Sequence, residues 1–337
     1  MDTRAEILHR QAIIVDAHND SLARMRSKGD PMDFGAVDEP YHCNTARLRE
    51  SGITALFSYV GSTDLIASLE LWQALLRHPE VYPDTYVVAR HAADICQAKQ
   101  DRRIALVGQL ESCSCLGKSL GALELFHRLG LRVANLTHGE GLDRHETSLQ
   151  VDGSVFDYTT ADARQAMRRE VRGLTEFGRD VVKTCNSLGI IVDLAHANDR
   201  TFFDALELSQ QPCIFSHGCV FAICPHFRGL MDDQIRALAA SGGVMGVAFY
   251  HRFIHQEAPS MDRLMDQVEH VVNLVGPEHV GLGSDYDGLP DDAVPIPPHP
   301  GRLIEFTEAL VRRGFDDDTV TKILGGNFLR VFQEVCG

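Results

Sequence analysis

Six short apolar runs of this chain each end in a residue that can bind a metal ion or move a proton. Histidine nitrogens and carboxylate oxygens are common donors for divalent ions such as zinc, and they also serve as general acids and bases. A polar residue buried by chance would show no preference for one end of its strand. The residues concerned are His18 and Asp20, Glu111, His138, His196, His217 and Asp285.

The first two runs offer a chelating pair and a carboxylate. His18 and Asp20 are two residues apart, and alternate residues of a strand face the same side, so both can hold one divalent ion. Glu111 follows an apolar run, where an unpaired carboxylate is costly to bury. On its own, Glu111 is explained equally well by a salt bridge to an arginine and by a carboxylate that bridges two metal ions.

Two histidines on neighbouring runs strengthen the metal interpretation. A single histidine at a strand end is more often a core residue, but His196 and His217 accompany the three residues above. Mixed nitrogen and oxygen donors fit zinc better than the oxygen-only sites of magnesium or calcium. Asp285 is interpreted as an acid–base group for a metal-activated water, with a turn-forming aspartate as the alternative. Asp287 fits the turn better.

The elements that must position these residues alternate along the whole chain. Apolar residues near the i, i+3, i+4, i+7 spacing predict helices at 64–77, 88–99, 120–129, 175–188, 199–209, 232–241, 261–275 and 303–313, with 317–324 and 327–335 closing the fold. Polar residues gathered at the carboxyl ends of alternating strands are typical of a (β/α)₈ TIM barrel. The sequence therefore predicts one α/β barrel domain over residues 1–337. The expected strands are 12–20, 53–60, 104–111, 131–138, 190–196, 213–217, 243–249 and 279–285.

Composition narrows the class of protein. The formal net charge of −15 argues against nucleic acid as a partner. No signal peptide or transmembrane segment is readable, and nine scattered cysteines suggest reduced thiols, so we expect a soluble cytoplasmic protein. Two long connections, 28–44 and 139–173, are expected above the catalytic face, and the proline-rich stretch 290–301 at its rim. The remaining histidines in or beside helices are expected on solvated faces: His9, His78, His91, His127 and His270.

Taken together, the motifs resemble the membrane (renal) dipeptidase family, zinc peptidases among the amidohydrolase-like barrels. The resemblance runs over nearly the whole chain. It rests on Val15-Asp16-Ala17-His18-Asn19-Asp20, Asn135-Leu136-Thr137-His138, Gly173-Leu174-Thr175-Glu176-Phe177-Gly178, Val192-Asp193-Leu194-Ala195-His196, Phe215-Ser216-His217, the segment from His279 to Asp285, and Gly325-Gly326-Asn327-Phe328-Leu329-Arg330-Val331-Phe332.

This resemblance implies two zinc ions per chain, with His18 and Asp20 on one ion, His196 and His217 on the other, and Glu111 bridging. It also implies that His138 and Asp285 act in catalysis and substrate binding, that Arg228 pairs with the terminal carboxylate of the substrate, and that the protein is a homodimer. From the residues alone, Arg228 would be given a surface role.

The sequence departs from the family pattern near the substrate. Ser112 and Cys113 follow Glu111 where the family has two glycines, and Gly218 and Cys219 replace two serines. The loop 139–144 also differs. We therefore predict a zinc dipeptidase in which metal-bound hydroxide attacks the peptide bond of a dipeptide or dipeptide-like molecule. Cleavage of another amide, a lactam or a lactone is the alternative, and a non-catalytic scaffold that keeps its metal is a third interpretation.

Overall fold

Eight parallel strands close into a barrel in this computed structural model, which describes all residues except 1–2, 38–39, 63, 139–148 and 153–159. Each strand pairs in parallel with its neighbours, and the pairings of β2 with β4 and of β1 with β10 close the ring. The barrel strands, in their order around the ring, are β1 (Ile14–Asn19), β2 (Ile53–Tyr59), β4 (Ile104–Glu111), β5 (Leu131–Asn135), β6 (Ile191–Asp193), β7 (Ile214–Val220), β9 (Val244–Val247) and β10 (Val280–Leu282).

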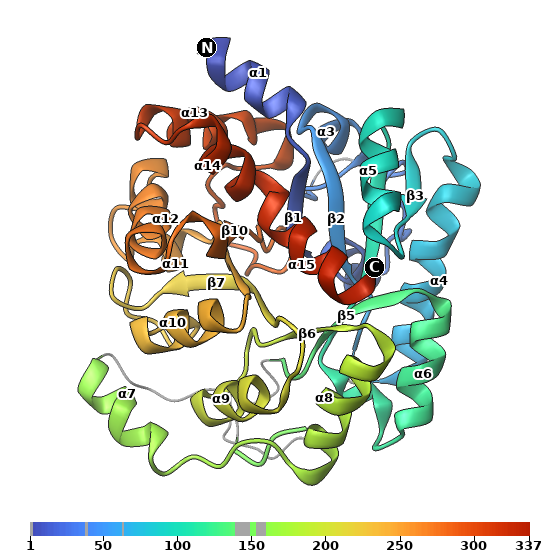
Figure 1. Cartoon of the computed structure of the whole chain (residues 1–337). Coiled ribbons are helices and arrows are strands. Elements are labelled where there is room, and N and C mark those ends of the chain that lie inside the picture. The colour runs from blue at the N-terminus through green and yellow to red at the C-terminus, as the bar shows by residue number, and fades with distance from the viewer. Residues whose placement is uncertain (1–2, 38–39, 63, 139–148, 153–159) are drawn as a thin grey trace.

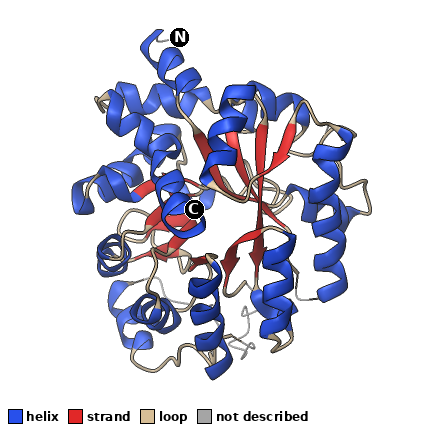
Figure 2. Cartoon of the chain, turned by 45° about the vertical axis from the view of Figure 1, so that its right-hand side comes forward, coloured by secondary structure: helices blue, strands red, loops and turns tan. Residues whose placement is uncertain are grey.

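Helices surround this barrel, with the strands inside, as Figures 1 and 2 show. All eight predicted strands and the predicted (β/α)₈ architecture are confirmed. The helices are α1 (Thr3–Gln11), α2 (Ser21–Lys28), α3 (Thr45–Glu50), α4 (Leu65–Val81), α5 (Ala92–Asp101), α6 (Leu120–Leu129), α7 (Ala161–Arg168), α8 (Glu176–Leu188), α9 (Asp199–Leu208), α10 (Asp232–Ala240), α11 (His251–Ile254), α12 (Met261–Val275), α13 (Ile304–Arg312), α14 (Asp317–Thr321) and α15 (Asn327–Cys336).

The apolar core lies on both sides of the barrel wall. One buried cluster fills the barrel with side chains such as Val107 and Val133, and it includes Phe328 and Phe332 of α15. These two phenylalanines contact Phe57 inside the barrel, at ring-centroid distances of 6.2 and 6.0 Å. The last helix therefore packs against the apolar barrel interior, and the polar side chains gather at the carboxyl ends of the strands.

Local signals set several helix ends. Thr175 caps α8, because its side chain accepts a hydrogen bond from Gly178 N at 2.9 Å, and Gly189 ends the helix with φ 72°. The expected helix 88–99 begins later, at Ala92, because residues 86–88 form an additional strand, β3 (Tyr86–Val88), which pairs with the start of β4. A further two-residue strand, β8 (Gly229–Leu230), pairs with β7.

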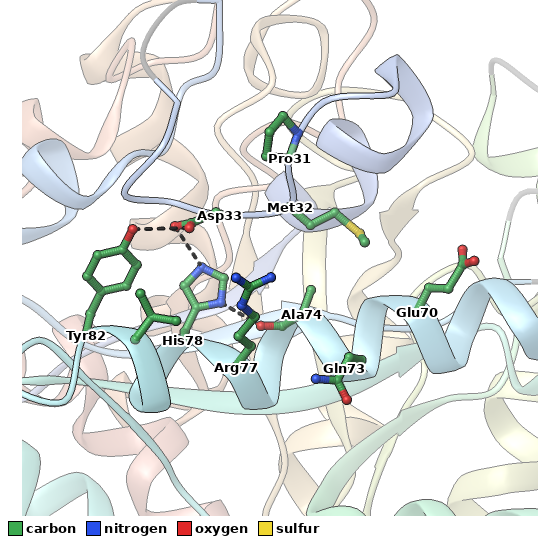
Figure 3. A pocket seen from close by; sticks show the side chains of 10 residues that line it. Pro31, Met32, Asp33, Glu70, Gln73, Ala74, Arg77, His78 and Tyr82 are labelled. Atoms are coloured by element: carbon green, nitrogen blue, oxygen red, sulfur yellow. Dashed lines mark hydrogen bonds and ion pairs between the residues drawn. The ribbon is translucent and has the colours of Figure 1, made fainter.

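Two histidines expected on solvated faces are buried, so that prediction was wrong for them. His9 bonds Thr307 Oγ1 at 2.7 Å and Ser51 O at 2.9 Å. His78 bonds Ala74 O at 2.7 Å and accepts from Phe34 N at 3.1 Å, as part of the interface between α4 and the segment after α2 (Figure 3). Each imidazole has partners for both ring nitrogens, which removes the cost of burying it.

Candidate metal centre and active site

The first part of the site is His18 on β1. Its Nδ1 lies 3.0 Å from Gln109 Oε1, and Gln109 Nε2 donates to Asp193 Oδ2 at 2.8 Å. Since the amide oxygen can only accept, His18 carries the proton on Nδ1 and directs Nε2 toward the acidic groups. This arrangement, a ligand histidine fixed through its other nitrogen, is typical of metal sites.

Glu111, the last residue of β4, lies at the centre of the cluster. Its Oε1 is 3.0 Å from His196 Nε2, 3.4 Å from His18 Nε2 and 3.5 Å from His217 Nε2. Its Oε2 is 3.5 Å from His138 Nε2. Burial raises the pKa of Glu111, and the nearby His138 and His18 oppose this effect. One carboxylate therefore faces four imidazoles.

The side chains of His196 and His217 approach each other through their Nε2 atoms, which are 3.1 Å apart. Burial lowers the pKa of both imidazoles well below the usual value, and neighbouring cationic groups add to that effect. Ser216 Oγ lies 2.8 Å from His217 Nδ1. His196 follows β6 with φ 64°, a left-handed conformation that is uncommon outside glycine and recurs at functional sites. Two neutral imidazoles thus converge on one point.

These side chains fit divalent metal ions. His18 Nε2 is buried without a hydrogen-bond partner among the described residues, although Asp20 Oδ2 is only 3.1 Å away. Burial favours the neutral form of His18, but the carboxylates of Asp20 and Glu111 raise its pKa well above the usual value. A cation bound here would satisfy both the orphaned nitrogen and the excess negative charge.

Three sets of donors lie close enough to share an ion, with the donor atoms of each set within 4.8 Å of one another. All five predicted ligands fall within these sets, which also include His138 and Asp285. Nitrogen and oxygen donors without thiolates suit zinc and similar ions. We call these seven residues the ligand cluster. One set is His18, Asp20 and Glu111, and a second is Glu111, His138 and His196. The third set is His18, His217 and Asp285.

Asp285 lies at the edge of the cavity, three residues after β10. Its backbone N donates to His18 O at 3.2 Å, and its φ is 63°. Burial and the nearby Asp20 carboxylate raise the pKa of Asp285 well above the usual value, which suits a group that holds a proton. A Cβ at Gly288 would lie 2.3 Å from Asp20 Oδ2 and 2.5 Å from Asp285 Oδ1, so any larger residue there would displace these two carboxylates.

Asp287 differs from Asp285. It is buried, accepts from Ser21 Oγ at 2.5 Å and from His42 N at 2.8 Å, and has φ 67°. These bonds join the turn after β10 to the first residue of α2 and to the connection that follows α2. Asp287 therefore holds the turn, as its sequence context suggests.

Arg228 lies in the same cavity as the ligand cluster, and it is buried. Burial lowers the pKa of its guanidinium, and the carboxyl groups of Asp285 and Glu111 oppose this effect. Its Nη2 donates to His217 O at 3.2 Å.

The cavity has a volume of about 260 Å³. Besides members of the ligand cluster and Gly288, the cavity is lined by what we call the substrate wall, made of Phe227, Arg228, Tyr250, Phe253, Leu289 and Pro290.

Sequence reasoning missed Gln109 and Asp16, two of the residues that hold the ligands in place. For Asp193 the sequence left two alternatives, a side chain that faces away from the site and a hydrogen bond to a group that supports a ligand. Gln109 shares its strand face with Glu111, two residues on, which was the available signal. Asp193 accepts from Gln109, from Ala195 N at 3.1 Å and from Ser216 N at 3.0 Å, so it links three strands. Asp16 accepts from Ser284 N and Oγ, and burial raises its pKa to about 6 against those hydrogen bonds.

The departures from the family pattern that the structure describes do not line the cavity, but Cys219 packs in one buried cluster with Tyr250, Phe253 and Leu289 of the substrate wall. Cys113 and Cys219 are fully buried, and neither they nor Ser112 and Gly218 line the cavity. The altered loop 139–144 lies outside the described residues. All nine cysteines are in the described part of the chain, and no disulfide joins them.

A second cavity of about 300 Å³ lies on the outer flank of the barrel and contains none of the predicted site residues (Figure 3). Two of its polar groups face Asp33: Tyr82 donates to that carboxylate at 3.1 Å, and His78 Nε2 is 3.9 Å from it. We therefore place the candidate active site in the cavity of the ligand cluster.

A closed parallel barrel with nitrogen and oxygen donors at the carboxyl ends of its strands defines a metal-binding (β/α)₈ barrel. The family model for the membrane dipeptidases, peptidase family M19, matches residues 2–336. The chain belongs to that family.

Relatives and solved structures agree with this assignment. Dipeptidase tcpJ of Claviceps purpurea is 30% identical over 288 residues, which are 85% of this chain and 63% of that protein. Dipeptidase aclJ of Aspergillus oryzae is 29% identical over 280 residues, covering 81% and 61%. The chain thus spans about three fifths of the length of these relatives.

Among solved structures, the dipeptidase AC of family M19 is 25% identical, has a TM-score of 0.84 and aligns over 97% of this chain and 99% of its own. A metallo peptidase from Rhodobacter sphaeroides, solved with a phosphinate mimic of the dipeptide L-Ala-D-Ala, is 24% identical with a TM-score of 0.83, covering 96% and 100%. None of the helices in the described part of this chain combines the length and apolar character needed to cross a membrane.

Proposed function

We propose that this protein is a zinc dipeptidase that hydrolyses the peptide bond of dipeptides or dipeptide-like molecules. The observation that carries the proposal is the position of Glu111, whose two carboxylate oxygens lie within 3.5 Å of four imidazoles. In this proposal Glu111 bridges two zinc ions, His18 and Asp20 hold one, and His196 and His217 hold the other. The names of the fungal relatives support the activity.

The side chains around the cavity suggest how a dipeptide would bind. When bound, two zinc ions would supply an activated water and polarise the amide carbonyl. Arg228 would bind the α-carboxylate through two parallel hydrogen bonds, because a guanidinium fork matches a carboxylate. The apolar side chains Phe227, Tyr250 and Phe253 would contact the substrate side chains and exclude water.

Two residues would handle charge and protons during the reaction. His138 would donate a hydrogen bond to the carbonyl oxygen as negative charge develops there. Asp285, which lines the same cavity as Arg228, would take a proton from the attacking water and deliver it to the leaving amine. Arg228 and Glu111 line one cavity of about 260 Å³, and this small volume supports a substrate the size of a dipeptide.

The test is turnover by the zinc-loaded protein of a panel of L-L, L-D and D-L dipeptides, each with a free and an amidated C-terminus. We expect hydrolysis of free dipeptides and a preference over amidated forms of roughly 10- to 150-fold, the worth of a charge-assisted contact. Arg228→Ala should remove this preference, while Arg252→Ala, at a more exposed arginine of α11, should keep it. Cleavage of lactams or lactones but not of dipeptides would favour the alternative hydrolase.

Assembly and location are further proposals. We propose a homodimer, as the resemblance implies, located in the cytoplasm, where nine cysteines without disulfides would stay reduced. Light scattering coupled to size-exclusion chromatography would test the first, and fractionation of the source cells would test the second.

A further inference from the structure

Helix α7 buries a single side chain among its eight residues, and that side chain is charged. Arg164 is 3% exposed, while the adjacent residues of the helix are exposed. Figure 1 shows α7 at the periphery of the molecule, beside α9 and α10. A buried arginine on a peripheral helix is costly unless its charge and its donors are all matched.

The guanidinium of Arg164 donates hydrogen bonds to three residues. Its Nη2 is 2.6 Å from Asp199 Oδ1 and 3.2 Å from Gln234 Oε1. Its Nη1 donates to the carbonyl oxygen of Gly229. Burial alone would raise the pKa of Asp199, but the charges of Arg164 and Arg168 lower it. The ion pair with Asp199 therefore fixes the guanidinium of Arg164, and its Nη1 reaches the backbone of Gly229, the residue that follows Arg228.

The segment that carries Arg228 has supports besides Arg164, among them the hydrogen bonds from Arg228 N to His226 Nδ1 at 3.1 Å and from Arg228 Nη2 to His217 O at 3.2 Å. Its strand β8 pairs with β7 only through Cys219 with Gly229 and Val220 with Leu230. The side chain of Phe227 packs against a small cluster that also takes up Met167 of α7. Helix α7 thus contacts the Arg228 segment at the carbonyl oxygen of Gly229, and its Met167 packs against the same cluster, Phe221 and Met231, as Phe227 does.

We infer that Arg164 is a positioning residue for substrate binding: through Gly229 it holds the backbone that aims Arg228 at the substrate carboxylate. This inference rests on the proposed function, because it requires that Arg228 binds that carboxylate. Arg164 itself does not line the cavity. Its effect should therefore appear in recognition of the carboxylate and not in the chemical step.

Arg164→Lys is the sharpest variant. Lysine keeps the positive charge beside Asp199 but, as a point charge, it cannot reach Asp199, Gln234 and Gly229 in one fixed fork. We expect KM for free dipeptides to rise roughly three- to tenfold, the usual worth of one hydrogen bond, with kcat and zinc content nearly unchanged. The preference for free over amidated dipeptides should fall by the same factor.

The matched control is Arg168→Gln. Arg168 also bonds Asp199, at 2.9 Å, but its other hydrogen-bond partners are Asp233 and the sulfur of Met231, not the carbonyl oxygen of Gly229. This variant should keep the wild-type KM and preference. If Arg164→Lys does not fold, the double variant Arg164→Met with Asp199→Asn removes both charges together and takes its place.

The outcomes separate the two proposals. Wild-type protein that treats free and amidated dipeptides alike would overturn the role of Arg228, and with it the proposed function. A wild-type preference that Arg164→Lys retains in full would overturn the inference alone. An equal rise in KM for both substrate types, or the same shift in Arg168→Gln, would also overturn it, because either result would mean general loosening of α7.

Discussion

The two sides of the cavity are built in different ways. The ligand cluster stands on barrel strands or within three residues of their ends, and hydrogen bonds such as those of Gln109 and Asp193 fix its histidines. The substrate wall comes from connections: Phe227 and Arg228 precede β8, and Tyr250 precedes α11. Under the proposed function, a rigid scaffold would thus set the metal chemistry, and loops would set which substrate is accepted. Variants on the two sides should therefore fail in different measurements.

The largest effect is expected at the centre of the ligand cluster. Glu111→Gln keeps the shape of the side chain but removes the charge that faces His18, His196 and His217. We expect loss of bound zinc from about two equivalents and no measurable turnover. Metal analysis and dipeptide hydrolysis check this, with the exposed Glu124→Gln on α6 as the control. Full activity in Glu111→Gln would remove the bridging role.

The second largest effect is expected at Asp285, the proposed acid–base residue. Asp285→Asn should keep the zinc content and lower kcat by roughly 10²- to 10⁴-fold, the usual contribution of a positioned acid–base group. Asp287→Asn serves as the neighbour control and should lower stability more than kcat, because Asp287 accepts several donors in its turn. If Asp285→Asn loses zinc instead, Asp285 is a ligand of the set that contains His18 and His217.

The sequence predicted the strands and the ligand cluster because both follow a local rule: an apolar run and the polar residue at its end are adjacent in the chain. The supports of the cluster do not follow such a rule. Gln109 meets Asp193 across 84 residues, and Arg164 meets Gly229 across 65. Helix α7 escaped prediction because its buried face carries an arginine, which hydrophobic periodicity cannot detect.

Two buried glutamines allow a direct comparison of the two sides. Gln109 bonds His18 and Asp193, whereas Gln267 accepts from Val220 N at 2.9 Å and donates to Phe253 O at 2.6 Å. Gln109→Met should weaken zinc affinity roughly 10- to 100-fold, as loss of an outer partner of a metal ligand does. Gln267→Met should leave zinc affinity unchanged and raise KM, through Phe253.

Both glutamine variants leave buried groups without partners, so each should lower the free energy of unfolding by about 1–3 kcal/mol. Zinc titration against a competing chelator, together with denaturant unfolding, separates the two effects. Equal losses of zinc affinity in both variants would mean that the ligand cluster and the substrate wall are not held independently.

The smallest effect is a pH dependence of stability that we expect from His226, the residue before Phe227 of the substrate wall. His226 Nδ1 accepts from Arg228 N at 3.1 Å, which requires an unprotonated Nδ1. Burial, together with the charges of Arg228 and Arg164, lowers the pKa of His226 from 6.5 to about 4. Between these values the unfolded chain binds a proton that the folded chain does not, so this contribution to stability is complete above pH 6.5 and is lost as the pH falls toward 4.

His226→Gln keeps an acceptor near Arg228 N but removes the titrating group. We expect the loss of unfolding free energy between pH 7 and pH 5 to be smaller than in wild type by on the order of 1 kcal/mol, measured by denaturant unfolding at each pH. His9→Gln is the comparison at the start of the chain, because burial also lowers the pKa of His9. It should reduce the pH dependence of stability as well, but leave the preference for free dipeptides intact. An unchanged pH dependence in His226→Gln would mean that protonation of His226 does not oppose the conformation that holds Arg228.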